Sequence, residues 1–301
     1  MDTQTSASLL PNVLCIIVTF NPDVASLKGT VNALLSQVRK ILVIDNKSDE
    51  QLTGCIVALA VHEQVEVIRC NDNIGLAAAQ NLGITHAQVR GFEYVLLLDQ
   101  DSHPDSSFTQ QLIQAFSKGP LELIGAVGPT IVDRRSSREA LLARTNTKIP
   151  LMIEKDFIIS SGTLIKTSVL GCVGGMNESL FIDHVDHDWC LRARALNYGI
   201  YQTSEATLFH ALGDQVIRLW LFRWRNFSVH SPLRNYYKVR NAFFLSKQCY
   251  VPPYWKHFFL KQSLMVALLS MVIASRRLQR LRYLVLGIYH GLTDRLGKFR
   301  G

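Results

Sequence analysis

Two aspartates that stand one residue apart are the first side chains of this sequence that could do chemistry. Asp99 and Asp101 follow the apolar run YVLLL, so their carboxylates would lie at the end of a buried strand. Carboxylate oxygens are the ligands that Mg²⁺ and Mn²⁺ prefer, and such an ion can hold a diphosphate. Because Asp-x-Asp pairs are also common in solvated turns, the pair indicates a metal site only in combination with other motifs.

The densest cluster of acidic and histidine residues is the run FIDHVDHDW, from Phe181 to Trp189. We expect a helix to begin at Asp186, where the helix dipole and the free N–H groups would keep its carboxylate ionised. An ionised carboxylate is suited to accept a proton. The alternative is an N-cap cluster whose histidines are merely solvated.

Four short apolar runs in the first hundred residues have the length and the β-branched composition of strands buried on both faces. They are Val13–Thr19, Lys40–Ile44, Val65–Arg69 and Tyr94–Leu98, and helical spacing lies between them over Ser26–Gln37 and Leu76–Ala87. This alternation predicts right-handed βαβ units and an α/β fold with a mostly parallel, twisted sheet flanked by helices.

A parallel sheet of this kind binds ligands beyond the carboxyl ends of its strands. Polar residues follow each predicted strand there, namely Thr19-Phe20-Asn21, Asp45-Asn46, Asn71-Asp72-Asn73 and Asp99-Gln100-Asp101. One such ending would be an ordinary turn or helix cap, but four together predict a single polar crevice. In the second half, we expect a strand interrupted by small residues over Phe157–Leu164 and a helix over Asp186–Tyr198.

Four segments, VTFNP, VIDNKS, NDNIGLAAAQN and LLLDQDS, together resemble the donor-binding half of the family 2 glycosyltransferases. The variant DQDS and the later run LFIDHVDHDWCLRA are similar to the rhamnosyltransferase branch in particular. The resemblance covers approximately residues 14–247, and its motifs keep the family's order and spacing. It implies the GT-A fold, a nucleotide-sugar donor, and a divalent cation, Mg²⁺ or Mn²⁺, as cofactor.

The resemblance also implies which residues contact the donor and the metal. The donor residues are Thr19, Phe20 and Asn21 at the nucleotide, Asp45 at the base or ribose, and Asn73, Gly75, Asn81, Asp99 and Gln100 along the same pocket. Asp101 would ligate the metal together with Asp99, and His210 is a third candidate ligand, for which a core histidine is the alternative. The sequence contains no G-x-G-x-x-G or P-loop pattern, which argues against NAD and ATP chemistry.

The same resemblance implies an inverting transfer, in which one carboxylate removes the proton of the acceptor hydroxyl as it attacks the anomeric carbon. Asp186 matches the second residue of the family's Glu-Asp pair and is the predicted base, although Val185 stands where Glu is usual. The rhamnosyltransferase branch tolerates that change. Asp183 is the rival base, and Asp188 is expected to cap the helix or to orient its neighbours.

A basic and aromatic stretch after Pro232 could offset the charge of a pyrophosphate. Arg234, Lys238 and Arg240 offer cationic donors, and Arg in particular suits bidentate phosphate contacts. The hydroxyl of Tyr236 adds another donor. The resemblance places this stretch beside the donor phosphates, whereas a solvated basic helix face with buried tyrosines is the alternative.

The net charge of +8 is concentrated in the last third of the chain, because from Ala211 onward 16 Lys and Arg oppose only Asp214 and Asp294. Two apolar stretches lie in this region, Ser263–Ser275 and Leu284–Leu292, with arginines between them. The first has 13 residues, too few for an ordinary membrane span of about 20. We therefore expect a basic amphipathic helical pair in the headgroup layer of an anionic membrane. A hairpin packed on the body or on a dimer partner, and a transmembrane hairpin, are the alternatives.

Composition narrows the class of protein further. With 48% hydrophobic and 19% charged residues, the chain is expected to fold rather than to be disordered. Six scattered cysteines without a C-x-x-C pair, and a first dozen residues without signal-peptide features, favour the reducing cytosol.

The sequence therefore predicts a GT-A domain over about residues 1–250, with a donor half over about 12–105 and an acceptor half over about 106–250, followed by a basic helical tail over 251–301. The resemblance implies a reaction that moves L-rhamnose from dTDP-L-rhamnose to a polyprenyl-pyrophosphate-linked saccharide of a bacterial surface polysaccharide, O-antigen or capsule, at the inner face of the cell membrane. A UDP-sugar donor, for N-acetylglucosaminyl or galactofuranosyl transfer, is the nearest alternative. A non-catalytic scaffold and a nucleic-acid-binding protein are more remote, because the tail carries no recognition motif.

Overall fold

The computed structural model describes the whole chain except residues 1–9, 119–122, 134–149, 211–215, 222, 229 and 301. Four parallel strands form its first half: β1 (Val13–Thr19), β2 (Lys40–Asp45), β3 (Val65–Arg69) and β4 (Tyr94–Asp99). These are the four strands that the sequence predicts, each within one residue of the expected ends. β1, β2 and β4 are almost completely buried, which explains their continuous apolar composition.

The second half of the chain extends this sheet. Its strands are β5 (His103–Pro104), β6 (Ile124–Asp133), β7 (Met152–Lys155), β8 (Thr163–Lys166) and β9 (Gly199–His210). The nine strands run in the order β3-β2-β1-β4-β8-β6-β9-β5, with β7 beside β9, and β8 is antiparallel to both of its neighbours. A separate antiparallel hairpin joins β10 (Val216–Leu221) to β11 (Arg223–Ser228).

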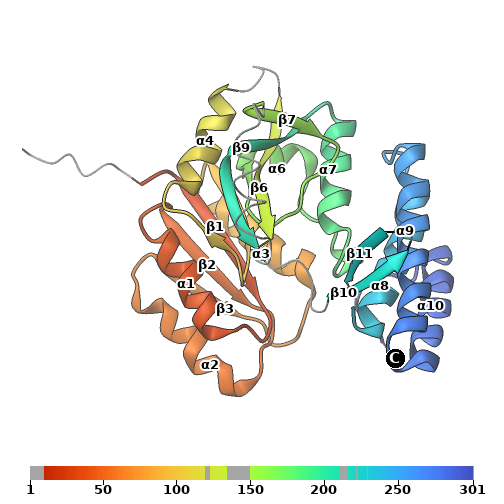
Figure 1. The fold of residues 1–301 in the computed structure, drawn as a ribbon. Helices are drawn as coiled ribbons and strands as arrows, with labels where there is room; N and C mark the ends of the chain where they lie inside the picture. The colour runs from red at the N-terminus through yellow and green to blue at the C-terminus, as the bar shows by residue number, and fades with distance from the viewer. Residues whose placement is uncertain are drawn as a thin grey trace, which may run out of the picture.

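Helices cover both faces of the sheet, so the predicted α/β class is confirmed (Figure 1). One face packs on α1 (Val24–Leu34), α2 (Glu50–Val57) with the short η1 (Ala58–Val61), and α4 (Phe108–Lys118). The other face packs on α3 (Leu76–Val89), α6 (Thr167–Val173), η2 (Glu178–Leu180) and α7 (Val185–Ala195). Successive residues of β1 point to opposite faces, so Leu14 and Ile16 join one core and Cys15 and Ile17 the other.

Two expectations for the second half are wrong in their bounds. The run Phe157–Leu164 is not one strand, because the chain turns at residues 160–162 and β8 begins only after this turn. Gly162 has a φ of +83°, a left-handed conformation that glycine adopts without strain. The predicted helix Asp186–Tyr198 is α7, which begins one residue earlier and ends three residues earlier.

Three helices form a group at one side of the molecule: α8 (Pro232–Ser246), α9 (Pro253–Ile273) and α10 (Arg277–Leu292) (Figure 1). α8 packs against both of the others. Gly291 allows α10 to lie close to α8, because a Cβ at this position would lie 2.5 Å from the Cβ of Phe243. The residues expected to form a tail thus pack on α8, and they also contact the body directly, where Nε1 of Trp255 donates to Asp156 at 3.0 Å.

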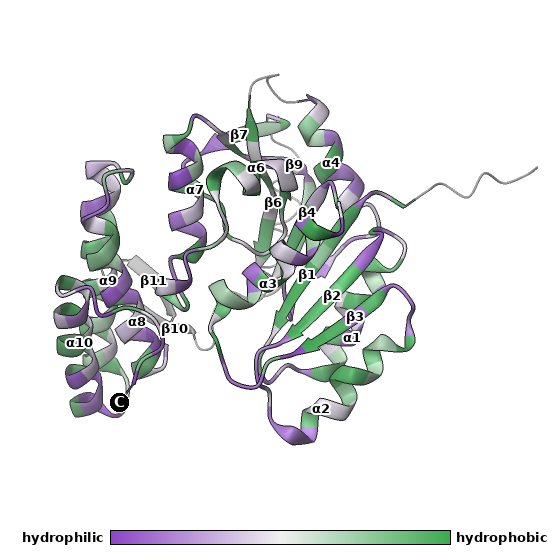
Figure 2. Cartoon of the chain, turned by 180° about the vertical axis from the view of Figure 1, so that it is seen from behind, coloured by the Kyte–Doolittle hydropathy of each residue, from purple (hydrophilic) through white to green (hydrophobic). Residues whose placement is uncertain are grey.

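The apolar run Ser263–Ser275 belongs to a longer helix than expected, because α9 has 21 residues. Within the described ranges, α9 is the one helix whose length and composition would let it cross a membrane. The same properties also suit a helix of a soluble protein, and α9 buries Phe259, Ser263, Ala267 and Ser270 within the molecule. Hydrophobic residues are frequent along both α9 and α10 (Figure 2).

Candidate active site

A cavity of about 880 Å³ lies at the carboxyl edge of the parallel strands. Its walls come from the ends of β1 and β4, the loop before α7, and the helices α8 and α9. The volume is in the range of small-molecule sites. The structure brings nine of the predicted site residues together in its lining: Thr19, Phe20, Asn73, Gly75, Asp99, Gln100, Asp101, Asp186 and Arg234.

The parallel register explains why the residues of the donor half meet. Thr19 of β1 lies level with Asp45 of β2, and Asp99 ends β4 on the other side of β1. Phe20 follows β1 directly, and its backbone N–H donates to Oε1 of Gln100 at 2.8 Å. The Phe20 side chain is about half exposed, so it presents a flat apolar ring to the cavity.

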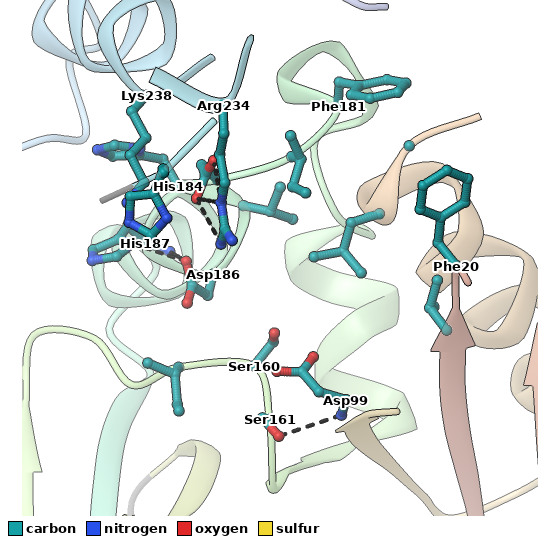
Figure 3. A pocket seen from close by; sticks show the side chains of 18 of the residues that line it. Phe20, Asp99, Ser160, Ser161, Phe181, His184, Asp186, His187, Arg234 and Lys238 are labelled. Atoms are coloured by element: carbon teal, nitrogen blue, oxygen red, sulfur yellow. Dashed lines mark hydrogen bonds and ion pairs between the residues drawn. The ribbon is translucent and has the colours of Figure 1, made fainter. Parts of the chain in front are cut away.

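Asp99 and Asp101 both line the cavity at the end of β4. The backbone N–H of Asp99 donates to Oγ of Ser161 at 3.3 Å, which fixes the strand end against the turn before β8 (Figure 3). Two neighbouring carboxylates suit Mg²⁺ or Mn²⁺ when a diphosphate or water supplies the remaining oxygen ligands. The described part of the chain holds no cluster of three or more His, Cys, Asp or Glu residues placed to bind a metal. His210 ends β9, but its side chain lies outside the described residues, so its role as a third ligand stays a prediction.

Asp186 lies in the first turn of α7 and faces the cavity opposite Asp99 (Figure 3). Its side chain is 20% exposed, and Oδ1 accepts the backbone N–H of His187 at 2.9 Å. The same oxygen lies 2.8 Å from Nδ1 of His187. Burial by itself raises the pKa of Asp186, but the charge of His187 and its two hydrogen bonds outweigh burial, so the pKa lies below its usual value. At neutral pH this carboxylate is therefore ionised, as a base requires.

The two other acids of the same run are engaged with partners. Asp183 forms an ion pair with Arg234, whose Nε lies 3.3 Å from Oδ2 of the acid. Asp188 is completely buried and accepts the hydroxyl of Tyr250 at 2.5 Å. Asp188 thus ties α7 to Tyr250 instead of capping the helix, and the choice of Asp186 over Asp183 as the base stays a prediction.

The loop before α7 has an unusual backbone conformation. Phe181, Asp183 and His184 all have φ values between +62° and +65°, the left-handed region that such residues rarely adopt. This conformation costs on the order of 1–3 kcal/mol per residue and tends to be kept at functional sites.

The two histidines of this run are held among other side chains. Burial lowers the pKa of His184 to about 3, with a smaller effect from the charge of His187, so its ring is neutral at pH 7. Both histidine rings pack edge-on against Phe259, so the alternative of merely solvated histidines is wrong.

Contacts from α8 and α3 hold this loop in place. Nδ2 of Asn241 donates at 2.8–3.0 Å to three carbonyl oxygens of the loop, those of Leu180, Ile182 and Asp183. The backbone N–H of Leu76, at the start of α3, donates to the carbonyl of Phe181 at 2.7 Å. Gly75 permits this approach, because a Cβ there would lie 2.5 Å from the Phe181 ring.

Five predicted donor residues of the described chain lie outside the cavity lining: Asn21, Asp45, Asn81, Tyr236 and Arg240. Asn21 and Asp45 support the loops next to the cavity, where the buried Asp45 accepts the backbone N–H of Ser48 at 3.0 Å. Asn81 binds the backbone of Met176 in both directions, at 2.7 and 2.9 Å. Their contacts with a donor stay predictions.

Two residues of α8 that were expected to meet phosphates lie against other parts of the chain. The hydroxyl of Tyr236 lies 2.8 Å from Nδ1 of His290 in α10. Arg240 is completely buried, and its guanidinium donates to the carbonyls of Leu180 at 2.8 Å and of Gly297 at 2.6 Å. The cations of α8 that do line the cavity are Arg234 and Lys238.

Several lining residues had no site role in the sequence analysis. They are Ser160, Ser161, Phe181, His184, His187, Phe259, Gln262, Ser263 and Val266. Asn46, which follows a predicted strand and was expected in the polar crevice, does line the cavity, and its Nδ2 donates to Oδ1 of Asn73 at 3.1 Å. The residues of α9 carried no usable signal, because no motif connects this helix with the sheet.

The first half of the sheet is parallel, and its strand β4 ends in a pair of carboxylates, whereas the second half contains both parallel and antiparallel strands. This arrangement is the GT-A fold of nucleotide-sugar transferases. Solved structures of the same fold include residues 1–349 of S. aureus TarS in complex with UDP-GlcNAc, at a TM-score of 0.57 and 13% identity, covering 94% of this chain and 82% of that chain. A mannosyltransferase from Pyrobaculum calidifontis, PcManGT, in complex with GDP-Man and Mn²⁺ also has a TM-score of 0.57, at 15% identity, covering 96% of this chain and 89% of that chain.

The sequence comparisons narrow this class to one family. The model for glycosyl transferase family 2 matches residues 14–174. The dTDP-rhamnosyl transferase RfbF of Shigella flexneri is 34% identical over 253 residues, which are 80% of this chain and 82% of that protein. The chain therefore belongs to glycosyl transferase family 2 and is a glycosyltransferase, and its resemblance to the rhamnosyltransferase branch is confirmed.

Proposed function

We propose that the chain transfers L-rhamnose, with inversion, from dTDP-L-rhamnose to a hydroxyl of a polyprenyl-pyrophosphate-linked saccharide during synthesis of a bacterial surface polysaccharide. The observation that supports this proposal is one cavity lined by Asp186 and by the neighbouring carboxylates of Asp99 and Asp101, in which Asp186 faces Asp99 (Figure 3). The rhamnose donor is supported by the 34% identity to a dTDP-rhamnosyl transferase.

The donor diphosphate would bind between the acids of β4 and the cations of α8. Asp99 and Asp101 would hold Mg²⁺ or Mn²⁺, and the bound ion supplies Lewis-acid assistance to the departing diphosphate. Arg234 and Lys238 reach the same cavity from α8 and add positive charge there. Phe20 would offer its exposed ring to the nucleotide base.

Asp186 would act as the base. Its carboxylate accepts the proton of the acceptor hydroxyl while the hydroxyl oxygen forms a bond to the anomeric carbon. The bond from that carbon to the diphosphate oxygen breaks, and its electron pair leaves with dTDP. Attack on the face opposite the leaving group inverts the configuration. The hydrogen bonds from His187 keep the carboxylate ionised until the acceptor arrives.

Asparagine substitutions at the two candidate acids test the identity of the base. Asp186→Asn should abolish transfer and change the dissociation constant of dTDP-L-rhamnose by no more than about threefold, because only the proton acceptor is lost. Asp183→Asn is the matched control, and it should keep measurable turnover. Full turnover in Asp186→Asn together with an inactive Asp183→Asn would assign the base to Asp183.

Thermal stabilisation by nucleotide sugars tests the donor. A ligand at 100 times its dissociation constant adds about 2.7 kcal/mol of stability, which gives a visible shift. A Mn²⁺-dependent shift with dTDP-L-rhamnose, and little with UDP-N-acetylglucosamine or UDP-galactofuranose, supports the rhamnose assignment. A shift with a UDP sugar alone would overturn that assignment and select the alternative donor.

The exposed sides of α9 and α10 support a place for the enzyme at the cytoplasmic face of an anionic membrane. Their exposed apolar side chains are Tyr254, Phe258, Met265, Leu268, Val272, Leu278, Leu281, Val285, Tyr289 and Leu292. Residues 251–300 also contain nine Lys and Arg against one acid, Asp294. Apolar side chains flanked by positive charge suit the headgroup layer of such a membrane. Because α9 also lines the cavity, an acceptor anchored in lipid would reach the base from this side.

Flotation with anionic liposomes tests this location. The double substitution Leu268→Glu and Val272→Glu should abolish flotation, because both side chains are exposed on the same stretch of α9. Val89→Glu on α3, an exposed valine outside the tail, is the control and should float like the parent. A parent chain that stays in solution would contradict the proposal, and a fall in molar mass in the double variant would indicate a dimer interface instead.

A further inference from the structure

A short segment after α10 lies against the loop that leads to the predicted base. We call this segment, Arg295–Arg300, the strap. The backbone N–H of Gly297 donates to the carbonyl of Ser179 at 2.7 Å, and the carbonyl of Gly297 accepts Nη1 of Arg240 at 2.6 Å. The strap is therefore hydrogen-bonded both to η2, at the start of the loop, and to α8, the helix whose Asn241 holds this loop.

Two further contacts attach the rest of the strap. The backbone N–H of Phe299 donates to the hydroxyl of Tyr237 at 2.8 Å, and the Phe299 ring centre lies 4.8 Å from that of Tyr236. Nζ of Lys298 lies 2.6 Å from the carboxylate of Asp72, in the donor loop. This ion pair is exposed and contributes little, so the backbone bonds and the aromatic ring account for most of the attachment.

Arg240 connects the strap with the loop. Its buried guanidinium donates on one side to Gly297 and on the other to the carbonyls of Ser179 and Leu180, at 3.2 and 2.8 Å. Its Nε donates to Oδ1 of Asn241 at 2.9 Å, which orients the amide that bonds to three carbonyls of the loop. A buried charge with an unmet donor is costly. Loss of the strap carbonyl would therefore disturb the bonds to the loop as well.

We propose that the strap positions the catalytic base, because it holds Arg240 and Asn241 against residues 179–184 and so sets where Asp186 stands in the cavity. The loop depends on outside contacts, since three of its residues keep left-handed backbone conformations that are unfavourable in isolation. The strap residues lie outside the cavity lining of the described chain, so they act through the residues they contact and not by touching a ligand in the cavity. The inference rests on the proposed role of Asp186.

Gly297→Pro tests the strap in the full chain. Proline has no N–H to donate to Ser179 and cannot adopt the φ of +81° found at this position. We expect kcat to fall at least about tenfold while the donor dissociation constant changes less than about threefold, because displacement of a reacting group affects turnover more than binding. Because a displaced strap leaves a donor of the buried Arg240 unmet, the melting temperature should also fall, so kcat is measured well below the thermal transition of the variant. Arg300→Ala, in the same segment but outside these bonds, is the matched control and should keep the parent kcat.

Phe299→Ala provides a second variant that leaves the backbone chemistry of the strap unchanged. It should reduce kcat in the same selective way, since it removes the ring that packs on Tyr236. Hydrogen exchange supplies a readout independent of transfer: amides of residues 179–187 should exchange faster in Gly297→Pro and Phe299→Ala than in Arg300→Ala, while amides of α1 should not change. Three results would each overturn the positioning role. They are equal exchange in all three variants, an unchanged kcat in Gly297→Pro, and parallel losses of kcat and donor binding. A parent chain without any rhamnosyl transfer would instead overturn the proposed function.

Discussion

An added methyl group at Gly75 should displace the loop that leads to the predicted base. The φ of this glycine is +90°, and a Cβ there would lie 2.5 Å from Cδ2 and 2.8 Å from the carbonyl oxygen of Phe181. The carbonyl cannot retreat without losing the 2.7 Å hydrogen bond from the N–H of Leu76. The ring is stacked on Tyr237 with centroids 5.0 Å apart, so it has little freedom to yield.

The magnitude of the effect of Gly75→Ala follows from these two conflicts. With φ +90° and ψ 160° the backbone lies in a region that is essentially restricted to glycine, where another residue costs about 1–3 kcal/mol, and overpacking of a filled site costs about 1–3 kcal/mol. The sum of about 2–6 kcal/mol corresponds to a fall in melting temperature of about 4–24 °C for a chain of this size. The displaced loop leads into α7, and a shift of the base by about 1 Å would lower turnover roughly a hundredfold.

Differential scanning fluorimetry and initial-rate measurements would check both numbers. Gly29→Ala in α1 is the matched control, because a Cβ there meets open space and the backbone is helical. That alanine should be neutral or stabilise the chain by about 0.5–1 kcal/mol, as expected for glycine replaced within a helix. If Gly75→Ala melts and turns over like the parent, the contact with Phe181 does not hold the loop, and the reasoning is refuted.

Three other substitutions probe the pH dependence, the metal and the packing of the tail. His187→Phe removes the charge and the side-chain hydrogen bond that lower the pKa of Asp186, so burial then raises that pKa. A base is lost as the pH falls through its pKa, so the acidic limb of the pH–rate profile should move to higher pH, and an unmoved limb would contradict the assignment of the base. Asp101→Asn should raise the Mn²⁺ concentration needed for half-maximal activity without changing the melting temperature, and an unchanged requirement would remove Asp101 from the metal site. Gly291→Val would bring a Cβ to 2.5 Å from that of Phe243. It should lower the melting temperature by several degrees, because overpacking costs about 1–3 kcal/mol, and an unchanged thermal transition would show that α10 can move away from α8 freely.

The donor half of the site could be predicted from the sequence because it depends on local pattern. Continuous apolar runs alternate with helical spacing, and parallel strands end at one edge of the sheet. Thr19, Asp45 and Asp99 therefore had to lie close together once the alternation was recognised, and the register of β1 with its two neighbours places them there. The turn at residues 160–162 escaped prediction, because the apolar residues around it suit a strand equally well.

The cations of α8 show where local pattern stops being sufficient. Arg234, Lys238 and Arg240 are similar in charge and stand on one helix, so composition assigns all three to the phosphates. An α-helix turns about 100° per residue, so Arg234 and Lys238 share a face, whereas Arg240 points away from them. The spacing separates the two groups, but only the packing of α8 decides that the first group meets the cavity and that Arg240 is buried against η2 and the strap.

The sequence by itself thus determined the fold class, the family, and the acids and strand endings that line the donor side of the cavity. The tertiary structure alone decided that α9 lines the cavity and what holds the loop before α7. Those features depend on pairs far apart in the chain: Asn241 bonds to Ile182 across 59 residues, and Lys298 meets Asp72 across 226. Local sequence propensities carry no information about such partners. In the unfolded chain each of these polar groups forms hydrogen bonds with water, and only folding brings its partner within reach.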